Sequence, residues 1–186
     1  WYRSIKQKEI MYSKEYITQL QSLHHDKSRP KGFGGKVKDL GAFHLFIKEW
    51  NPKSLLDYGC GKGYILNHLS TLYPTVNCHG YDPAVKIFNN IPTQDFDCVF
   101  SNDVLEHIEP NFIVDVLLHI NQLSKKHVWL RIDTMPARKT LPDGRNAHLI
   151  LESDTWWYDM ISRSINGNIV YAELDKKGKF DVAIEK

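Results

Sequence analysis

Three glycines at alternating positions carry the clearest chemical signal in the sequence. Gly59, Gly61 and Gly63 follow a short apolar segment, residues 54–58, and precede residues with helical spacing. Because glycine has no Cβ, a turn at this point can tighten, and its backbone amides can face a bound molecule. The pattern therefore predicts a ligand-binding loop at the junction between a strand and a helix.

Two carboxylates narrow the kind of ligand. Asp57 stands two residues before the first glycine, and Asp82 follows that glycine by 23 residues. An acid about 20 residues after such a loop is where a carboxylate holds the hydroxyls of a ribose. A dinucleotide-binding loop would have a glycine in place of Tyr64, and Asp57 would repel a pyrophosphate but favour an ammonium or sulfonium group. The residues thus favour a nucleoside that carries a cationic group.

A second group of residues could move protons. Glu106 and His107 lie one helical turn after an apolar strand pattern, at the edge where open α/β sheets bind ligands. His148 lies in a long irregular segment, residues 134–153, whose length is typical of a functional lid. We interpret all three as candidate catalytic residues. The alternative for His107 is a structural role, as a histidine on a helix face that is buried against the sheet. The long segment also carries Arg138, Lys139 and Arg145. The aromatic pair Trp156 and Trp157 follows this segment; the alternative interpretation places one of these two side chains in the core.

The elements that must position these residues alternate between strand and helix patterns. Such alternation favours an α/β fold with a parallel, doubly wound sheet. The tight turn at residues 175–178 would place one antiparallel strand in that sheet. We expect residues 1–52 to form an N-terminal helical arm or lid and residues 53–186 to form the core. The predicted strands are residues 54–58, 76–81, 97–101, 127–133, 169–174 and 180–184. The predicted helices are residues 1–25, 36–50, 64–71, 104–123 and 154–165. Residues 26–35 are a predicted loop, and we hypothesise that residues 33–36 fold over the ligand.

Composition and charge exclude several classes of protein. The 186 residues are 42% hydrophobic and 25% charged, which is typical of one globular domain rather than a disordered chain. No apolar run reaches the roughly 18 residues of a membrane span. Three cysteines without a C-x-x-C spacing argue against a disulfide scaffold and a zinc site, and favour a reducing, cytoplasmic location. Residues 1–38 hold nine Lys or Arg against three acids, which indicates either a solvated helix face or a surface for a phosphate or carboxylate partner.

In three ordered motifs the sequence resembles the class I S-adenosylmethionine-dependent methyltransferases of the small-molecule branch. The motifs are LLDYGCGKGY at residues 55–64, HGYDP at residues 79–83 and DFDCVFSNDVLEHI at residues 95–108. The resemblance extends from Lys53 to the C-terminus. It implies a Rossmann-like core with three αβα layers, S-adenosyl-L-methionine as the cofactor and methyl transfer as the activity.

The resemblance also implies roles for individual residues. The glycine loop would line the methionine moiety, and Asp57 would help to hold its ammonium group. Asp82 would bind the ribose hydroxyls, with Pro83 beside the adenine. Residues 102 and 103 would border the sulfonium, and Gln94 or Asp95 is the candidate for an acidic-type adenine contact. The predicted cofactor-binding residues are Asp57, Tyr58, Gly59, Cys60, Gly61, Gly63, Asp82, Pro83, Asn102 and Asp103, and no metal ligand is predicted.

Absent motifs narrow the acceptor. The Pro-Pro-aromatic motif of nucleic-acid amino methylases is missing after residue 102, as are the Pro-Cys nucleophile of cytosine-ring methylases and the paired glutamates of arginine methylases. We therefore expect a small-molecule acceptor with an oxygen, nitrogen or carbon nucleophile, and no membrane partner, while the oligomeric state is left open. Three alternatives remain: a non-catalytic S-adenosylmethionine-binding protein, an RNA- or nucleotide-directed methyltransferase, and a nicotinamide-dependent oxidoreductase, against which Tyr64 argues.

Overall fold

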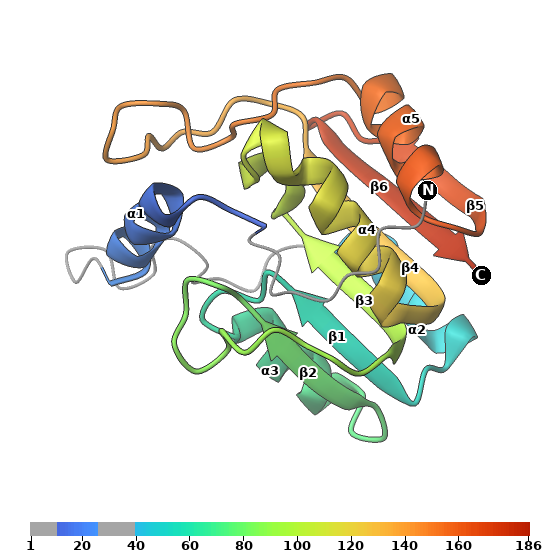
Figure 1. Ribbon diagram of the computed structural model, residues 1–186. Helices are drawn as coiled ribbons and strands as arrows, with labels where there is room; N and C mark the ends of the chain where they lie inside the picture. The colour runs from blue at the N-terminus through green and yellow to red at the C-terminus, as the bar shows by residue number, and fades with distance from the viewer. Residues whose placement is uncertain (1–10, 26–39) are drawn as a thin grey trace, which may run out of the picture.

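A six-stranded sheet forms the centre of the protein (Figure 1). The computed structural model describes residues 11–25 and 40–186. Within them the strand order is β2-β1-β3-β4-β6-β5, and β6 is antiparallel to both of its neighbours while the other pairs are parallel. The predicted sheet, mostly parallel with one antiparallel strand, is therefore confirmed. The strands are β1 (Ser54–Tyr58), β2 (Asn77–Tyr81), β3 (Phe96–Asn102), β4 (Ser124–Asp133), β5 (Asn168–Leu174) and β6 (Lys179–Glu185).

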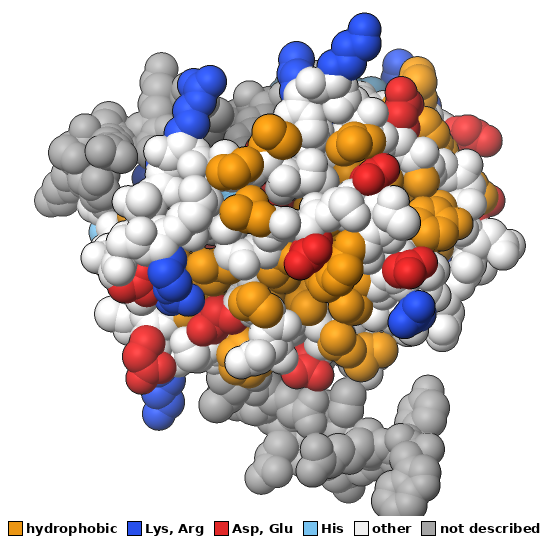
Figure 2. All heavy atoms as spheres, turned by 90° about the horizontal axis from the view of Figure 1, so that it is seen from above, with side chains coloured by type: hydrophobic (Ala, Val, Ile, Leu, Met, Phe, Trp, Pro, Cys, Tyr) orange, Lys and Arg blue, Asp and Glu red, His pale blue; other side chains and the backbone are white. Residues whose placement is uncertain are grey.

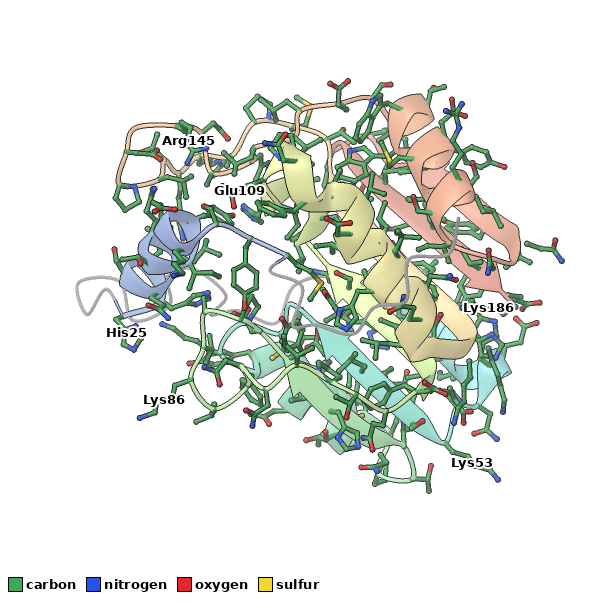
Figure 3. The ribbon with its side chains drawn as sticks, in the orientation of Figure 1. His25, Lys53, Lys86, Glu109, Arg145 and Lys186 are labelled. Atoms are coloured by element: carbon green, nitrogen blue, oxygen red, sulfur yellow. The ribbon has the colours of Figure 1, made fainter. Side chains whose placement is uncertain are left out.

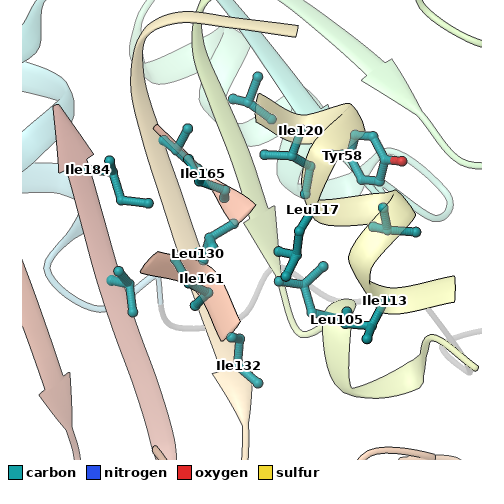
Figure 4. Packing of buried hydrophobic residues seen from close by; sticks show 14 of the residues in the cluster. Tyr58, Leu105, Ile113, Leu117, Ile120, Leu130, Ile132, Ile161, Ile165 and Ile184 are labelled. Carbon is teal, nitrogen blue, oxygen red and sulfur yellow. The ribbon is translucent and has the colours of Figure 1, made fainter. Parts of the chain in front are cut away.

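Side chains of the inner strands alternate between two apolar cores, one on each face of the sheet. Leu56, Val99 and Leu130 belong to the core under α4 and α5, part of which is drawn in Figure 4. Leu55 and Trp129 belong to the core under α2 and α3. Because helices cover both faces, a ligand can reach β1 and β3 only where these strands end. The helices are α1 (Lys14–His25), α2 (Phe43–Trp50), α3 (Tyr64–Leu72), α4 (Ile113–Leu123) and α5 (Asp154–Ser164), and none of these described helices is long and apolar enough to cross a membrane.

The N-terminal helices are shorter than predicted. The helix predicted at residues 1–25 begins at Lys14, and residues 1–10 lie outside the described part of the chain. The helix predicted at residues 36–50 begins at Phe43 and ends as expected, because Asn51 adopts a left-handed conformation before Pro52. Residues 26–39, which include the predicted loop and the possible cover at residues 33–36, also lie outside the described part.

The single long helix predicted at residues 104–123 is wrong. The chain instead forms two short 3-10 turns, Leu105–His107 and Pro110–Phe112, and only then the helix α4. Proline disfavours helical backbone in the residue before it, and Glu109 is extended with ψ at 133°. The break at Pro110 leaves residues 105–107 as a separate turn at the carboxyl end of β3.

Helix α1 contacts the loops at the carboxyl edge of the sheet. The backbone amide and the hydroxyl of Ser13, just before the helix, donate to the carboxylate of Glu109 at 2.7 and 2.8 Å. Figure 3 shows Glu109 between α1 and the segment that carries Arg145. Farther along α1, Gln19 donates to Asp143 at 2.9 Å. These bonds join the N-terminal helix to two segments that lie far from it in sequence.

A buried ion pair joins the neighbouring antiparallel strands β4 and β6 and yields a test of the fold. Arg131 on β4 and Asp181 on β6 are cross-strand partners, and their side chains lie 2.5 Å apart at 5% and 6% exposure. We expect Asp181→Ala to lower the free energy of unfolding by about 3–5 kcal/mol, because it leaves a buried guanidinium poorly compensated. Urea denaturation measures this change. The control is Asp159→Ala, which removes an exposed pair with Arg163 and should have a negligible effect; an equal loss in both variants would contradict the prediction.

Candidate active site

A cavity of about 1010 Å³ opens at the carboxyl ends of β1, β2, β3 and β4. One wall is the glycine loop with residues 81–83, and another is the segment at residues 102–108. The remaining walls come from residues 11–24 around α1 and from residues 133–139 and 147–148. The volume lies at the upper end of the range for ligand pockets, so two small molecules could occupy the cavity together.

The glycine loop is shaped by close approach more than by ligand-facing amides. Gly59, Gly61 and Gly63 all have positive φ, and a Cβ on Gly59 would lie 2.5 Å from the methyl groups of Val104. The amides of Gly59 and Cys60 donate to the carbonyl of residue 81, and the amide of Gly63 donates to the carbonyl of Cys60. The expectation that these amides face a ligand is therefore wrong. Gly63 also lies outside the cavity wall, packed against the ring of Phe88.

Asp57 is a buried carboxylate in the wall of the cavity. Its Oδ2 atom has no hydrogen-bond partner. Burial, reinforced by the negative charge of Asp82, raises the pKa of Asp57 to about 8. A buried polar atom without a partner is uncommon and costly, and a cationic group would restore the ordinary ionisation of this carboxyl.

Asp82 follows β2 directly and fixes the glycine loop against that strand. Its two carboxylate oxygens accept from the backbone amides of Gly61 and Ala84, each at 2.9 Å. Each carboxylate oxygen has a second lone pair, so the group can still accept from a ligand hydroxyl. Asp82 and its neighbour Pro83 both line the cavity, as the sequence predicted.

Tyr58 and Cys60 border the cavity but are packed into the protein. The Tyr58 hydroxyl lies 3.0 Å from Nδ1 of His119, and its ring belongs to the core under α4. Burial raises the pKa of the Cys60 thiol, so this cysteine is an inert filler of the turn rather than a nucleophile. Neither side chain offers a charge to a ligand.

The end of β3 supplies two further polar side chains to the cavity. Both polar atoms of the Asn102 side-chain amide are buried without a hydrogen-bond partner. Asp103 has φ at 53°, and its carboxylate accepts from Nζ of Lys179 at 2.8 Å. The same Nζ atom donates to Asp133 at 2.7 Å. Lys179 therefore compensates two carboxylates, a role that the sequence did not indicate.

The three candidate catalytic residues meet at one place, although His148 is far from the other two in sequence. The backbone amides of Leu149 and Ile150 donate to the Glu106 carbonyl at 2.8 and 3.1 Å, which brings the long segment against the 3-10 turn. The imidazole rings of His107 and His148 meet edge to face, with centroids 4.7 Å apart. Both histidines line the cavity.

Glu106 lies behind the two histidines rather than in the cavity wall, which corrects its predicted position at the mouth of the site. It is 0% exposed, and its Oε1 atom accepts from the Asp133 amide at 3.1 Å. Burial and the nearby charge of Asp103 raise the pKa of Glu106. Burial lowers the pKa of His148, so this imidazole is neutral near pH 7. Glu106 can thus reach a ligand only through a neighbouring group.

The other sequence-based candidates are divided between the cavity and the rest of the protein. Arg138 and Lys139 line the cavity, whereas Arg145 pairs with Asp143 at 2.7 Å away from it. Trp157 is fully buried in the core, and Trp156 packs against the same cluster. Asp95 lies at the amino end of β3, 3.8 Å from Lys125, so neither it nor Gln94 is at the ligand edge.

Sequence reasoning missed the aromatic side chains that α1 and the residues just before it contribute to the cavity. Tyr12 and Tyr16 line the cavity, and the Tyr16 hydroxyl donates a short hydrogen bond to the backbone carbonyl of His107. Burial raises the pKa of Tyr16, so the hydroxyl keeps its proton. Two tyrosines four residues apart within the helix predicted at residues 1–25 were the available signal, but the same spacing is typical of ordinary core packing.

Comparisons with known proteins agree with this architecture. A search of curated proteins found no match. Among solved structures, one match is Burkholderia thailandensis 1,6-didemethyltoxoflavin-N1-methyltransferase with bound 1,6-didemethyltoxoflavin and S-adenosylhomocysteine. The two sequences are 14% identical, the TM-score is 0.63, and the match covers 100% of this chain and 98% of that one. Another is an O-methyltransferase family protein from the same organism, with 13% identity, a TM-score of 0.61, and coverage of 89% and 62%.

Human N-acetylserotonin methyltransferase in complex with SAM is a third match, with 13% identity, a TM-score of 0.56, and coverage of 92% of this chain and 56% of that one. Four of the matching proteins, the Burkholderia O-methyltransferase family protein among them, are longer, and this chain spans only 54% to 62% of their lengths. At these identities the structures show a shared fold. A family model described as a methyltransferase domain matches residues 18–182, and the chain therefore belongs to the methyltransferase domain family.

Proposed function

We propose that this protein transfers a methyl group from S-adenosylmethionine to a small-molecule acceptor. The observation that carries the proposal is the buried carboxylate of Asp57, which faces the cavity with one oxygen unpartnered. A buried carboxyl in that position is protonated without a ligand and favours a cationic ligand when ionised, and S-adenosylmethionine carries both an ammonium and a sulfonium. Membership of the methyltransferase domain family supports the same conclusion.

The residues around the cavity fit the parts of the cofactor. Asp57 would hold the ammonium group, and Asp82 has lone pairs available for the ribose hydroxyls. Pro83 would contact the adenine. The unpartnered amide of Asn102 and the carboxylate of Asp103 would border the sulfonium. When bound, the cofactor supplies an electrophilic methyl group, and the protein's task is to align the acceptor with it.

The acceptor would lie between the cofactor residues and the two histidines. A nucleophile that attacks a methyl group must lose its proton, and His148 is a neutral imidazole in the cavity wall. Its Nδ1 atom lies 2.5 Å from the carbonyl of Met135, so Nδ1 carries the ring proton and Nε2 is the basic nitrogen. We assign His148 as the group that orients the acceptor and receives its proton.

Helix α1 would act as the lid over the acceptor, as part of the arm at residues 1–52. Its Tyr16 packs with Leu141 and Ala147 in a small apolar cluster that joins it to the long segment after β4. Tyr12 and Leu20 close the cavity from the same side. Helix α2, in contrast, packs against the sheet and serves the core. Exclusion of water by α1 would protect the aligned acceptor.

A small molecule fits the surface better than a nucleic acid does. The described part of the face in Figure 2 mixes hydrophobic side chains with acidic ones, and its Lys and Arg are scattered. Arg138 and Lys139 in the cavity wall favour an acceptor that carries a carboxylate or phosphate group. A cytoplasmic location is supported by three free cysteines, of which Cys60 and Cys98 are buried.

The direct test is release of S-adenosylhomocysteine from S-adenosylmethionine in the presence of a panel of hydroxylated and amino-substituted anionic metabolites. We expect release with at least one class of acceptor and tight cofactor binding in calorimetry without any acceptor. Binding without release on any acceptor would favour the non-catalytic alternative. Activity on RNA that falls steeply with salt would favour the nucleic-acid alternative.

Asp57→Asn should weaken S-adenosylmethionine binding about 10- to 100-fold, because a neutral amide cannot compensate the ammonium group. Isothermal titration calorimetry measures the change. Asp115→Asn is the matched control, since Asp115 is exposed on α4 and should leave the affinity unchanged. Equal affinity of wild type and Asp57→Asn would remove Asp57 from the cofactor site.

Cofactor binding should also release a proton from Asp57. Its pKa is about 8 without ligand, so the carboxyl is mostly protonated at pH 7 and must ionise beside the ammonium group. Affinity should therefore rise as pH increases from 6 to about 8 and then level off. Calorimetry at pH 7 in two buffers of different ionisation enthalpy counts the protons, and Asp57→Asn should abolish the release. A buffer-independent binding enthalpy in the wild type would contradict this assignment.

A further inference from the structure

We propose that Glu106, His107 and His148 form a binding site for one divalent transition-metal cation at the acceptor end of the cavity. Each side chain offers one ligand atom, and these atoms all lie within 4.8 Å of one another. Two of the ligands come from one 3-10 turn and the third from the long segment after β4. The metal-binding part of this inference stands on the geometry alone, and its role in catalysis rests on the proposed function.

Both imidazole rings are held in the way that metal-binding histidines are held. Nδ1 of His107 lies 2.6 Å from the carbonyl of Ala147, and Nδ1 of His148 lies 2.5 Å from the carbonyl of Met135. A carbonyl only accepts, so each Nδ1 carries a proton and each neutral ring has its lone pair on Nε2. Ligating histidines characteristically donate their other ring N–H to a carbonyl or carboxylate in this manner.

Glu106 supplies the second, independent observation. It is 0% exposed, and its Oε2 atom has no hydrogen-bond partner. Lys179 compensates the carboxylates of Asp103 and Asp133 at 2.8 and 2.7 Å. Among the described residues, the basic side chain that lies within 4.0 Å of the Glu106 carboxylate is His148, whose Nε2 atom is 4.0 Å from Oε1. A buried carboxylate without a hydrogen bond on one oxygen is costly, and a cation would compensate it.

The distance between Glu106 and His148 distinguishes a metal site from a proton relay. At 4.0 Å the Oε1 and Nε2 atoms are too far apart for a hydrogen bond. That distance is about twice a metal–ligand bond of roughly 2.0 Å, so a cation fits between them, with a contraction of somewhat less than 1 Å to reach tetrahedral geometry. Two imidazoles and one carboxylate suit Zn²⁺, Co²⁺ or Mn²⁺ better than Mg²⁺, which prefers oxygen ligands.

A cation at this site would also define the class of acceptor. His107 and His148 line the cavity, so the open coordination positions would face it. A hydroxyl bound there would have a lowered pKa and would lose its proton near neutral pH. Under the proposed function, the preferred acceptor is therefore a small molecule that binds through a hydroxyl oxygen. When the cation is bound, His148 is a ligand, and the hydroxyl gives its proton to water in the cavity; the role of His148 as the proton acceptor applies to the metal-free protein.

The test uses the full chain after removal of metals with a chelator. We expect Co²⁺ to bind with one-to-one stoichiometry in calorimetry, to give visible absorption bands, and to be displaced by Zn²⁺. His148→Ala and the nearly isosteric Glu106→Gln should each weaken binding by at least about 100-fold, since each removes a direct ligand and loss of a supporting partner alone costs 10- to 100-fold. His25→Ala, which removes an exposed histidine on α1, is the control and should bind like the wild type.

Three results would overturn the proposal: no stoichiometric metal binding by the wild type, weakened binding in His25→Ala as well, or unchanged binding in folded Glu106→Gln. Circular dichroism checks the fold of each variant. The proposed function is tested separately, by S-adenosylmethionine binding with and without metal. Failure of S-adenosylmethionine to bind would contradict the proposed function but not the metal site. Cofactor binding without any metal binding would contradict only the metal site.

Discussion

The structure depends on the uneven distribution of buried charge along its central strands. Apolar side chains fill both faces of the sheet, and helices cover them. Acidic side chains therefore collect where β1, β2 and β3 end, and several of them are buried there. A buried carboxylate is tolerated only with a hydrogen bond, a cation or a proton. Backbone amides donate hydrogen bonds to Asp82, and Lys179 forms an ion pair with Asp103. Under the two proposals, the ammonium group of the cofactor would compensate Asp57, and a metal cation would compensate Glu106.

One backbone feature decides which groups meet at the acceptor end. Pro110 prevents a continuous helix after β3, and the residues before it form a separate turn whose carbonyl at Glu106 receives two amides from the long segment. In a continuous helix that carbonyl would face residue 110, which as a proline has no N–H to donate and whose ring would clash with it. The interruption therefore makes the contact between His107 and His148 possible, although nothing in the hydrophobic pattern marks it.

The sequence predicted what local patterns control and missed what long-range pairing controls. The strands, the glycine loop, Asp57 and Asp82 followed from short motifs with a clear physical reason. The helix at residues 104–123 failed because its apolar spacing continues through Pro110, and the pattern was given more weight than the proline. The pairing of Lys179 with Asp103 depends on the position of β6 beside β4; the turn at residues 175–178 predicted an antiparallel strand but not its second neighbour. The sequence predicted neither a zinc site nor any metal ligand, because the cysteine spacing was its only metal signal, whereas the proposed site of Glu106, His107 and His148 offers nitrogen and oxygen atoms that the fold brings together.

The two ends of the cavity are connected by α1. Its Tyr16 hydroxyl donates to the carbonyl of His107, and residues of the same helix line the cavity opposite the glycine loop. The carbonyl of His107 can accept this bond only while α1 lies over the site. Displacement of the helix would leave the Tyr16 hydroxyl without that acceptor and would admit water to the histidines. Under the proposed function, the position of α1 over the cavity and the position of His107 are therefore linked by one hydrogen bond, so that the acceptor end would be complete only when α1 covers it.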